Sequence, residues 1–215
     1  MIVLQRTDKI NKREWILRLL GRKLFCRQSS RVPLGLALNF AQELQKYLES
    51  LPEVLNVSLA GSTRRWKESV GDVDLVVATR EPKKVAEEFV KHPRLSHILE
   101  QASDRILACS RLGIKVELIQ VPPEEFYLTV FRDTGSKAHW LHLERVLAER
   151  GIIPELVKGS SVEEFEKGVY AALGLAYIPP ELREDQGEIE AAVQGQLPQL
   201  LALGDIKGDL HVHTN

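Results

Sequence analysis

The sequence lacks any apolar run near the roughly 20 residues that a membrane-spanning helix needs, and no charged start leads into an apolar export signal. We therefore expect a cytoplasmic protein with no membrane partner. Only two of its 215 residues are cysteines, Cys26 and Cys109, without metal-ligand spacing. This indicates a reducing cytosol and no disulfide framework. The 44% apolar content is sufficient for one large or two small cores.

Net charge is also scarce, since 29 Lys/Arg residues oppose 30 Asp/Glu residues. The two signs are unevenly distributed along the chain. Residues 1–67 hold 13 basic against 5 acidic residues, whereas residues 68–215 hold 16 against 25. A near-neutral average would argue against a nucleic-acid partner, but a basic N-terminal third can contact a phosphate backbone.

Apolar spacing predicts an α/β (α+β) fold built on a small mixed sheet. A helix is expected after Pro33 and ends near Pro52, because a residue before proline is pushed out of the helical region. More helices are expected towards the C-terminus. The predicted strands span residues 57–60, 73–78, 105–109 and 114–119, and the predicted helices span residues 82–90, 95–101, 136–150, 162–173 and 188–203.

Two carboxylates stand two residues apart at the start of the most apolar predicted strand. Asp72 and Asp74 therefore project from the same face of a sheet. Like charges held so close repel each other unless a cation lies between them. Mg²⁺ prefers oxygen ligands and commonly uses one or two carboxylates together with substrate phosphates. The pair predicts a metal site.

A small turn precedes this pair by about ten residues. Gly61 lets a ligand approach the backbone, and Ser62 can donate its hydroxyl to a phosphate at the start of a short helix. Arg64, Arg65 and Lys67 surround the same place, and an arginine can bind phosphate with two donors at once. A phosphate-binding turn beside a metal site suits phosphoryl or nucleotidyl transfer.

A third carboxylate comes from the next strand, where Glu117 alternates with apolar neighbours. It could bind a second metal and orient or deprotonate an attacking hydroxyl. Each of these features taken alone has a simpler explanation. An Asp-x-Asp is often a turn or cap, a lone Glu is often a solvated strand position, and basic residues often form a solvated helix face. Their combination and order are more specific than the parts.

The stretch from Gly61 and Ser62 through Arg65 to Gly71, Asp72 and Asp74 resembles the signature of nucleotidyltransferases with the DNA polymerase beta fold. Further matches make the chain similar to bacterial family X DNA polymerases, in which a PHP phosphoesterase domain follows the polymerase core. The likeness covers residues 31–215. The further matching segments are residues 31–35, 121–126, 134–139, 177–185 and 208–214.

The resemblance implies four parts: a helical, basic remnant of a fingers-like region (1–53), a palm (54–135), a thumb (136–203) and the start of a truncated PHP domain (204–215). It implies Mg²⁺, or Mn²⁺, on Asp72, Asp74 and Glu117, and Zn²⁺ or Mn²⁺ on His211 and His213 of a complete PHP domain. The implied substrates are a dNTP and primer-template or gapped DNA. The residues implied to contact the triphosphate are Gly61, Ser62, Arg65 and Gly71.

Several positions depart from the family pattern. Glu117 stands where the family has Asp, and Arg132-Asp133 replaces an aromatic pair beside the incoming sugar. Trp140 and Glu144 replace Asn and Arg, and a negative Glu144 would repel a DNA phosphate. These departures leave three functions open: a repair-type DNA polymerase acting by a two-metal mechanism, a catalytically impaired core that binds DNA or nucleotide for the PHP domain, and a nucleotidyltransferase with a non-DNA acceptor.

Overall fold

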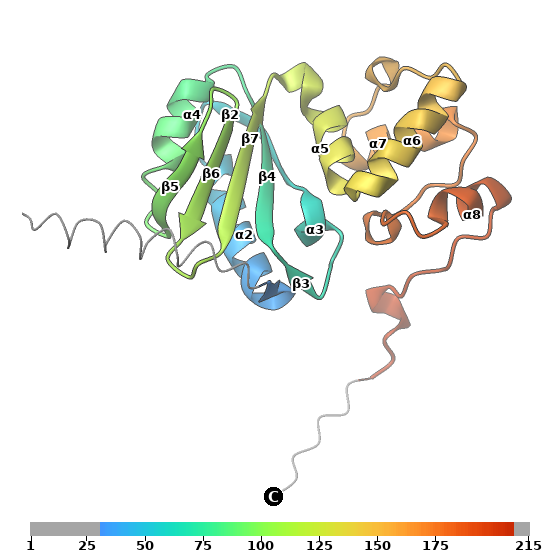
Figure 1. Ribbon diagram of the computed structural model, residues 1–215, viewed down its shortest axis with the longest axis horizontal. Coiled ribbons are helices and arrows are strands. Elements are labelled where there is room, and N and C mark those ends of the chain that lie inside the picture. The colour runs from blue at the N-terminus through green and yellow to red at the C-terminus, as the bar shows by residue number, and fades with distance from the viewer. Residues whose placement is uncertain (1–30, 209–215) are drawn as a thin grey trace, which may run out of the picture.

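The computed structural model describes residues 31–208, apart from the side chain of Leu203 (Figure 1). A five-stranded sheet lies beside a group of helices, and the chain passes from the first to the second without returning. In chain order the strands and α-helices are β1 (Val32–Pro33), α2 (Leu34–Glu49), β2 (Val54–Leu59), α3 (Gly61–Arg64), β3 (Ser69–Val70), β4 (Asp72–Thr79), α4 (Pro82–Phe89), β5 (Leu95–Gln101), β6 (Arg105–Ser110), β7 (Lys115–Val121), α5 (Phe126–Thr134), α6 (Lys137–Glu149), α7 (Val162–Ala172) and α8 (Glu188–Gln194). The short 3-10 helices span Pro123–Glu125, Pro154–Leu156, Pro180–Leu182 and Leu203–Asp205.

The main sheet has the strand order β2-β4-β7-β6-β5. Only β4 and β7 run parallel, and the other neighbours are antiparallel. A separate two-stranded sheet joins β1 to β3. The mixed sheet and the helical region that follows it confirm the expected fold class.

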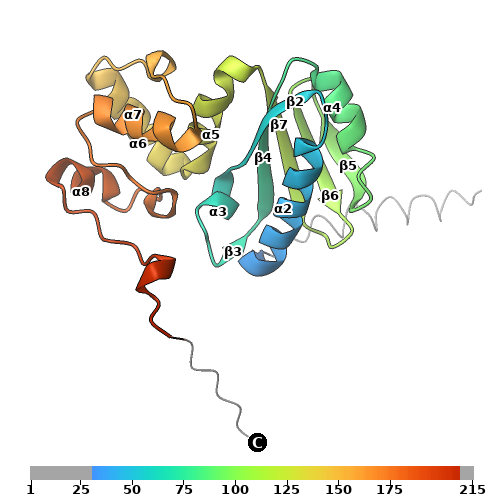
Figure 2. The same ribbon diagram turned by 180° about the vertical axis from the view of Figure 1, so that it is seen from behind.

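One face of the sheet is covered by α2 and α4, which stand in front of it in Figure 2. On α2, Phe40, Leu44 and Leu48 recur every four residues and are almost fully buried. They pack in one cluster with Val73 and Leu75 of β4. Because side chains alternate along a strand, the acidic residues between these valines and leucines face the other way.

The opposite face of the sheet is covered only in part, by α5. Val76 of β4 and Ile119 of β7 pack there against Phe126 and Val130. The chain then continues into α6, α7 and α8, which share a core around Tyr170 with the end of α5. The uncovered part of this sheet face therefore opens beside the helical region.

Two expected helices differ in the structure: the one predicted for residues 188–203 ends at Gln194, and the one predicted for residues 95–101 is wrong. Residues 95–101 form the edge strand β5, not a helix. The pairing of β5 with β6 shifts in register between Leu95 and His97 and again between Ile98 and Glu100. These irregularities break the alternation of apolar and polar residues that marks a regular strand, so the segment reads as helical.

Of the two cysteines, Cys109 lies within the described residues. Cys109 is buried on β6 and is not a free thiol, so the expectation of unpaired cysteines is wrong at this position. Cys26 lies outside the described residues. Across residues 31–208, no helix is both long and apolar enough to cross a membrane.

Candidate functional site

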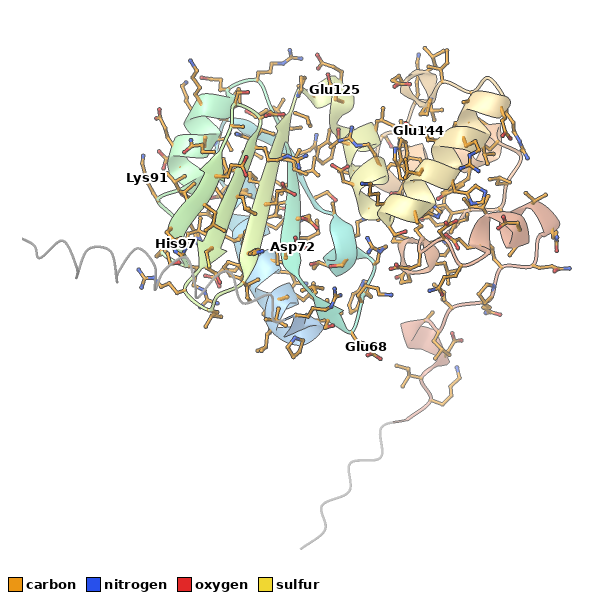
Figure 3. All side chains as sticks on the ribbon, viewed as in Figure 1. Glu68, Asp72, Lys91, His97, Glu125 and Glu144 are labelled. Atoms are coloured by element: carbon orange, nitrogen blue, oxygen red, sulfur yellow. The ribbon has the colours of Figure 1, made fainter. Side chains whose placement is uncertain are left out.

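Three acidic side chains lie on the partly covered face of the sheet. Asp72 and Asp74 alternate with Val73, which is fully buried in the core on the opposite face. Asp74 pairs in register with Glu117 on the parallel neighbour β7. Figure 3 marks Asp72 at the end of β4 that lies towards β3. The structure thus places the predicted carboxylates on adjacent strands with a common orientation.

A pocket of about 310 Å³ opens where Asp74 and Glu117 face the helical region. Its walls include Arg132, Asp133 and Trp140, three of the positions that depart from the expected family pattern. Glu144 lies further along α6 and is exposed to solvent (Figure 3). The remaining lining residues are Arg105, Ile119, Gly135 and Lys137.

The carboxylates concentrate negative charge around Asp74. Burial raises the pKa of Asp74 to about 7, and the neighbouring charges of Asp72, Glu117 and Asp133 push it in the same direction. Arg65 opposes the shift only weakly. Without a bound cation, the ionised form of Asp74 is therefore disfavoured. A cation at this position would offset the excess negative charge.

Glu117 already has a cationic partner. Its Oε1 accepts a hydrogen bond of 2.9 Å from Nη1 of Arg105 on β6, and both side chains are partly exposed. Within residues 31–208, no three His, Cys, Asp or Glu side chains are gathered closely enough to hold a metal ion as they stand. Asp72 and Asp74 supply the oxygen donors that Mg²⁺ prefers, whereas Glu117 would have to leave Arg105 to join them.

The turn between β2 and α3 is built against Asp74. Gly61 has a φ of 58°, and a Cβ atom there would lie 1.7 Å from Oδ2 of Asp74. The backbone N–H of Ala60 donates to the carbonyl oxygen of Asp74 at 2.9 Å. Only glycine tolerates both the conformation and the contact, so the turn and the carboxylate are fixed together.

Two more predicted nucleotide contacts lie near this turn. The hydroxyl of Ser62 is buried and has no hydrogen-bond partner among the described residues. A buried polar atom without a partner costs about 1–3 kcal/mol, which a ligand could recover. Gly71 is exposed at the entry to β4, with open space around its Cα. Ser62 is thus available to a ligand, and Gly71 leaves room for one.

The fourth predicted contact, Arg65, already binds other groups of the protein. Its Nε donates to Glu184 at 2.7 Å, and its Nη1 donates to the carbonyl oxygen of Thr134 at 2.7 Å. Lys67 approaches the same Glu184 carboxylate at 3.3 Å. Between these two basic residues, Trp66 has a positive φ of 55° and a side chain that is 60% exposed. The basic side of the turn therefore contacts the C-terminal part of the chain.

A buried ionic cluster lies beneath the turn. Glu166 of α7 is fully buried and accepts two hydrogen bonds from Arg183, at 2.9 and 2.8 Å, and one from Arg64, at 2.6 Å. Burial would raise the pKa of Glu166, but the hydrogen bonds and charges of Arg183 and Arg64 outweigh it and lower the pKa to about 2. The guanidinium of Arg183 also lies over the rings of Phe131 and Tyr170.

Sequence reasoning missed the roles of Arg105, Glu166 and Arg183. Arg183 lies in the segment 177–185 that matches the family, but the sequence alone indicates no role for it. The two histidines expected for a second metal site, His211 and His213, lie outside the described residues.

Comparison with curated proteins supplies the decisive observation. The chain is 33% identical over 197 residues, 87% of its own length, to the DNA polymerase/3'-5' exonuclease PolX of Bacillus subtilis (strain 168). The chain is a relative of the family X DNA polymerases. It spans about a third (34%) of the length of that relative. No family model matches the chain.

The family X relationship agrees with the fold. The mixed sheet corresponds to a polymerase beta-like palm, and the helices that follow it correspond to a thumb. The pocket lies between the sheet and the helices that follow it, with Asp74 and Glu117 on the sheet and Lys137 and Trp140 on α6.

Proposed function

We propose that the chain is the core of a cytoplasmic, Mg²⁺-dependent DNA polymerase that transfers dNMP from a dNTP to a primer 3′-hydroxyl during DNA repair. Residues 54–135 would form the palm and residues 136–203 the thumb. Residues 1–53 would be a fingers-like remnant, and residues 204–215 would begin a PHP domain. The observation that carries this proposal is the contact between the turn at Gly61 and Asp74, which lines a pocket between the sheet and the helical region.

The residues of the palm fit a divalent metal in part. Asp72 and Asp74 would hold Mg²⁺, or Mn²⁺, because both present carboxylate oxygens from one face of β4. When bound, the metal would neutralise charge on the triphosphate and on the departing pyrophosphate. For a complete PHP domain we propose Zn²⁺ or Mn²⁺ on His211 and His213.

The chain's own groups would bind and orient the substrates. Ser62 would donate its unpartnered hydroxyl to a phosphate oxygen, and Gly61 would leave the backbone open to the same group. Arg65 would contribute positive charge from beside Asp74. Gly71 leaves space at the entry to β4 for the triphosphate.

Transfer of dNMP to the primer needs only the dNTP and the primer 3′-hydroxyl as reactants. The primer 3′-oxygen forms a bond to the α-phosphorus, and the bond from that phosphorus to the bridging oxygen breaks and releases pyrophosphate. The 3′-hydroxyl loses its proton in the same step. Glu117 would accept this proton once it is released from Arg105, since it is the third carboxylate facing the pocket.

One observation favours a weaker second candidate, a palm and thumb that bind nucleotide or DNA for a PHP domain without efficient catalysis. Arg105 holds Glu117, and Arg132 forms an ion pair with Asp133 in the same pocket. These pairs neutralise two of the carboxylates near Asp74. A core with its acidic groups engaged in this way would bind substrates but turn them over slowly.

Primer extension with a gapped or primer-template DNA, a dNTP and Mg²⁺ separates the two. We expect Asp74→Asn, which keeps the shape but not the charge, to reduce incorporation at least about a hundredfold. Glu87→Gln, an exposed change on α4, serves as the matched control and should leave the rate unchanged. Arg105→Gln should raise incorporation if the ion pair restrains Glu117.

The results of these assays distinguish the candidate functions. No incorporation by the wild-type protein, with Asp74→Asn having no effect, contradicts the polymerase. Tight dNTP and DNA binding combined with little or no incorporation by the wild-type protein supports the second candidate, and a gain of incorporation in Arg105→Gln assigns the impairment to the ion pair with Glu117. Label transfer to an acceptor other than the primer would favour a nucleotidyltransferase with a non-DNA acceptor.

A further inference from the structure

A second pocket, of about 450 Å³, lies far from the carboxylates. It forms where the carboxyl ends of the parallel strands β4 and β7 meet the start of α4 and the turn between β5 and β6. In open α/β sheets, the crevice outside the carboxyl ends of parallel strands is a common place for ligands. Its lining residues are Thr79, Arg80, Pro82, Ser103, Asp104, Gln120, Val121, Pro122 and Pro123.

This pocket is separate from the proposed polymerase site. Thr79 stands five positions along β4 from Asp74, which corresponds to about 17 Å at the rise of a strand. Gln120 is an odd number of positions along β7 from Glu117, so the two side chains project from opposite faces of the sheet. A ligand here would contact none of the residues that line the polymerase pocket.

The floor of the pocket carries an unsatisfied amide. Gln120 is only 4% exposed, and neither its amide nitrogen nor its amide oxygen has a hydrogen-bond partner among the described residues. An unpaired buried polar group destabilises the fold, and such groups are few in folded proteins. The backbone of Gln120 is satisfied, since its N–H donates to the carbonyl oxygen of Asp104 at 2.7 Å. The cost therefore falls on the side chain alone.

The unpaired amide atoms of Gln120 indicate which polar groups a ligand would have to present. The amide needs one acceptor for its N–H and one donor for its oxygen, side by side on one edge. Adenine presents this pair through N7 and the 6-amino group, and a glutamine amide can bind both at once. A rotation of the terminal amide group would turn Gln120 from the pocket floor towards such an edge.

The remaining walls suit the rest of a nucleotide. Pro82, Pro122 and Pro123 with Val121 give mostly apolar surfaces against which a planar base can pack. Arg80 is exposed at the rim and forms no ion pair with a residue in the described part of the chain, so it is available to a phosphate. Asp104, also exposed, can accept a hydrogen bond from a ribose hydroxyl. We propose that this pocket binds an adenine nucleotide, with the base on Gln120 and the phosphate at Arg80.

Binding of AMP to the whole chain in EDTA tests the proposal, because chelation removes the metal that the polymerase site would need. We expect AMP to raise the melting temperature in a concentration-dependent way. Gln120→Met, of similar volume, should weaken AMP binding about tenfold or more while leaving the melting temperature of the free protein equal or higher. Arg80→Gln, a surface change, should weaken AMP binding but not adenosine binding.

The controls separate this site from the other. Asp74→Asn should bind AMP as the wild type does, and Gln120→Met should retain primer extension. Purine riboside 5′-phosphate, which lacks the 6-amino group, should bind more weakly than AMP. The proposal is overturned if millimolar AMP gives no shift, if Gln120→Met binds AMP normally, or if loss of the amino group has no effect.

Discussion

Gly61 is the residue at which backbone shape and proposed chemistry depend most closely on each other. Its positive φ and its contact with Asp74 leave no space for a side chain. We expect Gly61→Ala to destabilise the protein by about 1–3 kcal/mol or more, because it combines backbone strain with a steric clash. The rate of nucleotide incorporation should fall by more than the loss of folded protein explains, because the clash also displaces the Asp74 carboxylate. Urea unfolding and primer extension measure the two effects.

Gly71 provides a matched control for this substitution. Apart from its two chain neighbours, no residue within 31–208 places an atom within 4 Å of a Cβ added at Gly71, and the φ of Gly71 is not in the left-handed region. Gly71→Ala should therefore change stability by no more than about 0.5 kcal/mol. Equal stability losses in the two variants would contradict the argument for Gly61.

Single residues also show where sequence reasoning succeeds and where it stops. Gly61, Ser62 and Asp74 could be placed together because all three lie within one short turn and the strand that follows. The partner of Glu117 could not, because Arg105 reaches it across two antiparallel strands whose register is set by the whole sheet. A cation beside a carboxylate is invisible until that register is known.

At the scale of elements, regular patterns were read correctly and irregular ones were not. The helix after Pro33 was predictable because Phe40, Leu44 and Leu48 repeat at helical spacing on one buried face. The strand β5 was not, because two register shifts in its pairing with β6 disturb the alternation along it. Edge strands are where such bulges are commonly found, so this error has a physical origin.

The helix α7 carries a charge that should make stability depend on pH. The pKa of Glu166 is lowered to about 2 in the folded protein, below the ordinary value of 4.5 for a glutamate, because Arg183 and Arg64 donate hydrogen bonds to it. Its contribution is therefore complete above about pH 4.5 and is lost as the pH falls towards 2. The full difference corresponds to about 3 kcal/mol. Urea unfolding between pH 6 and pH 3 should show a steep loss that is smaller in Glu166→Gln.

Glu163 offers the comparison on the same helix. It is 63% exposed and pairs with Lys167 one turn away, a contact worth about 0.3–0.5 kcal/mol. Glu163→Gln should leave both the stability and its pH dependence nearly unchanged. Glu166→Gln should cost about 3–5 kcal/mol at neutral pH, because it leaves buried arginine charge uncompensated. The assignment of the buried cluster fails if the two variants behave alike.

At the scale of the whole molecule, charged groups join the two regions in addition to the apolar contacts that α5 makes with the sheet. Arg64 and Glu166 are 102 residues apart in the sequence, and Arg65 and Glu184 are 119 apart. Both pairs connect the C-terminal end of the short helix α3, where Arg64 is the last residue and Arg65 the C-cap, to the helical region. Ion pairs between residues so far apart in the sequence cannot be predicted from local patterns. The sequence therefore indicates a sheet region and a helical region, but not the ion pairs that join them.

This connection predicts cooperative unfolding. The wild-type protein should unfold in one transition, with amides of β4 and α7 losing hydrogen-exchange protection together. Arg64→Met keeps most of the side-chain volume but removes the charge that links the two regions. We expect α7 to exchange earlier than β4 in this variant. Separate opening of the two elements in the wild type would contradict the predicted coupling.

The exposed side chain of Trp66 gives the turn a built-in optical reporter. The indole stands in solvent directly after Arg65, at the edge of the region proposed to bind the triphosphate. Indole fluorescence responds to nearby charge and to changes in hydration, so occupation of the turn should be readable without any attached dye. A second indole, Trp140, lines the acidic pocket itself. The molecule can therefore report on its own ligand from both sides of the palm-thumb boundary.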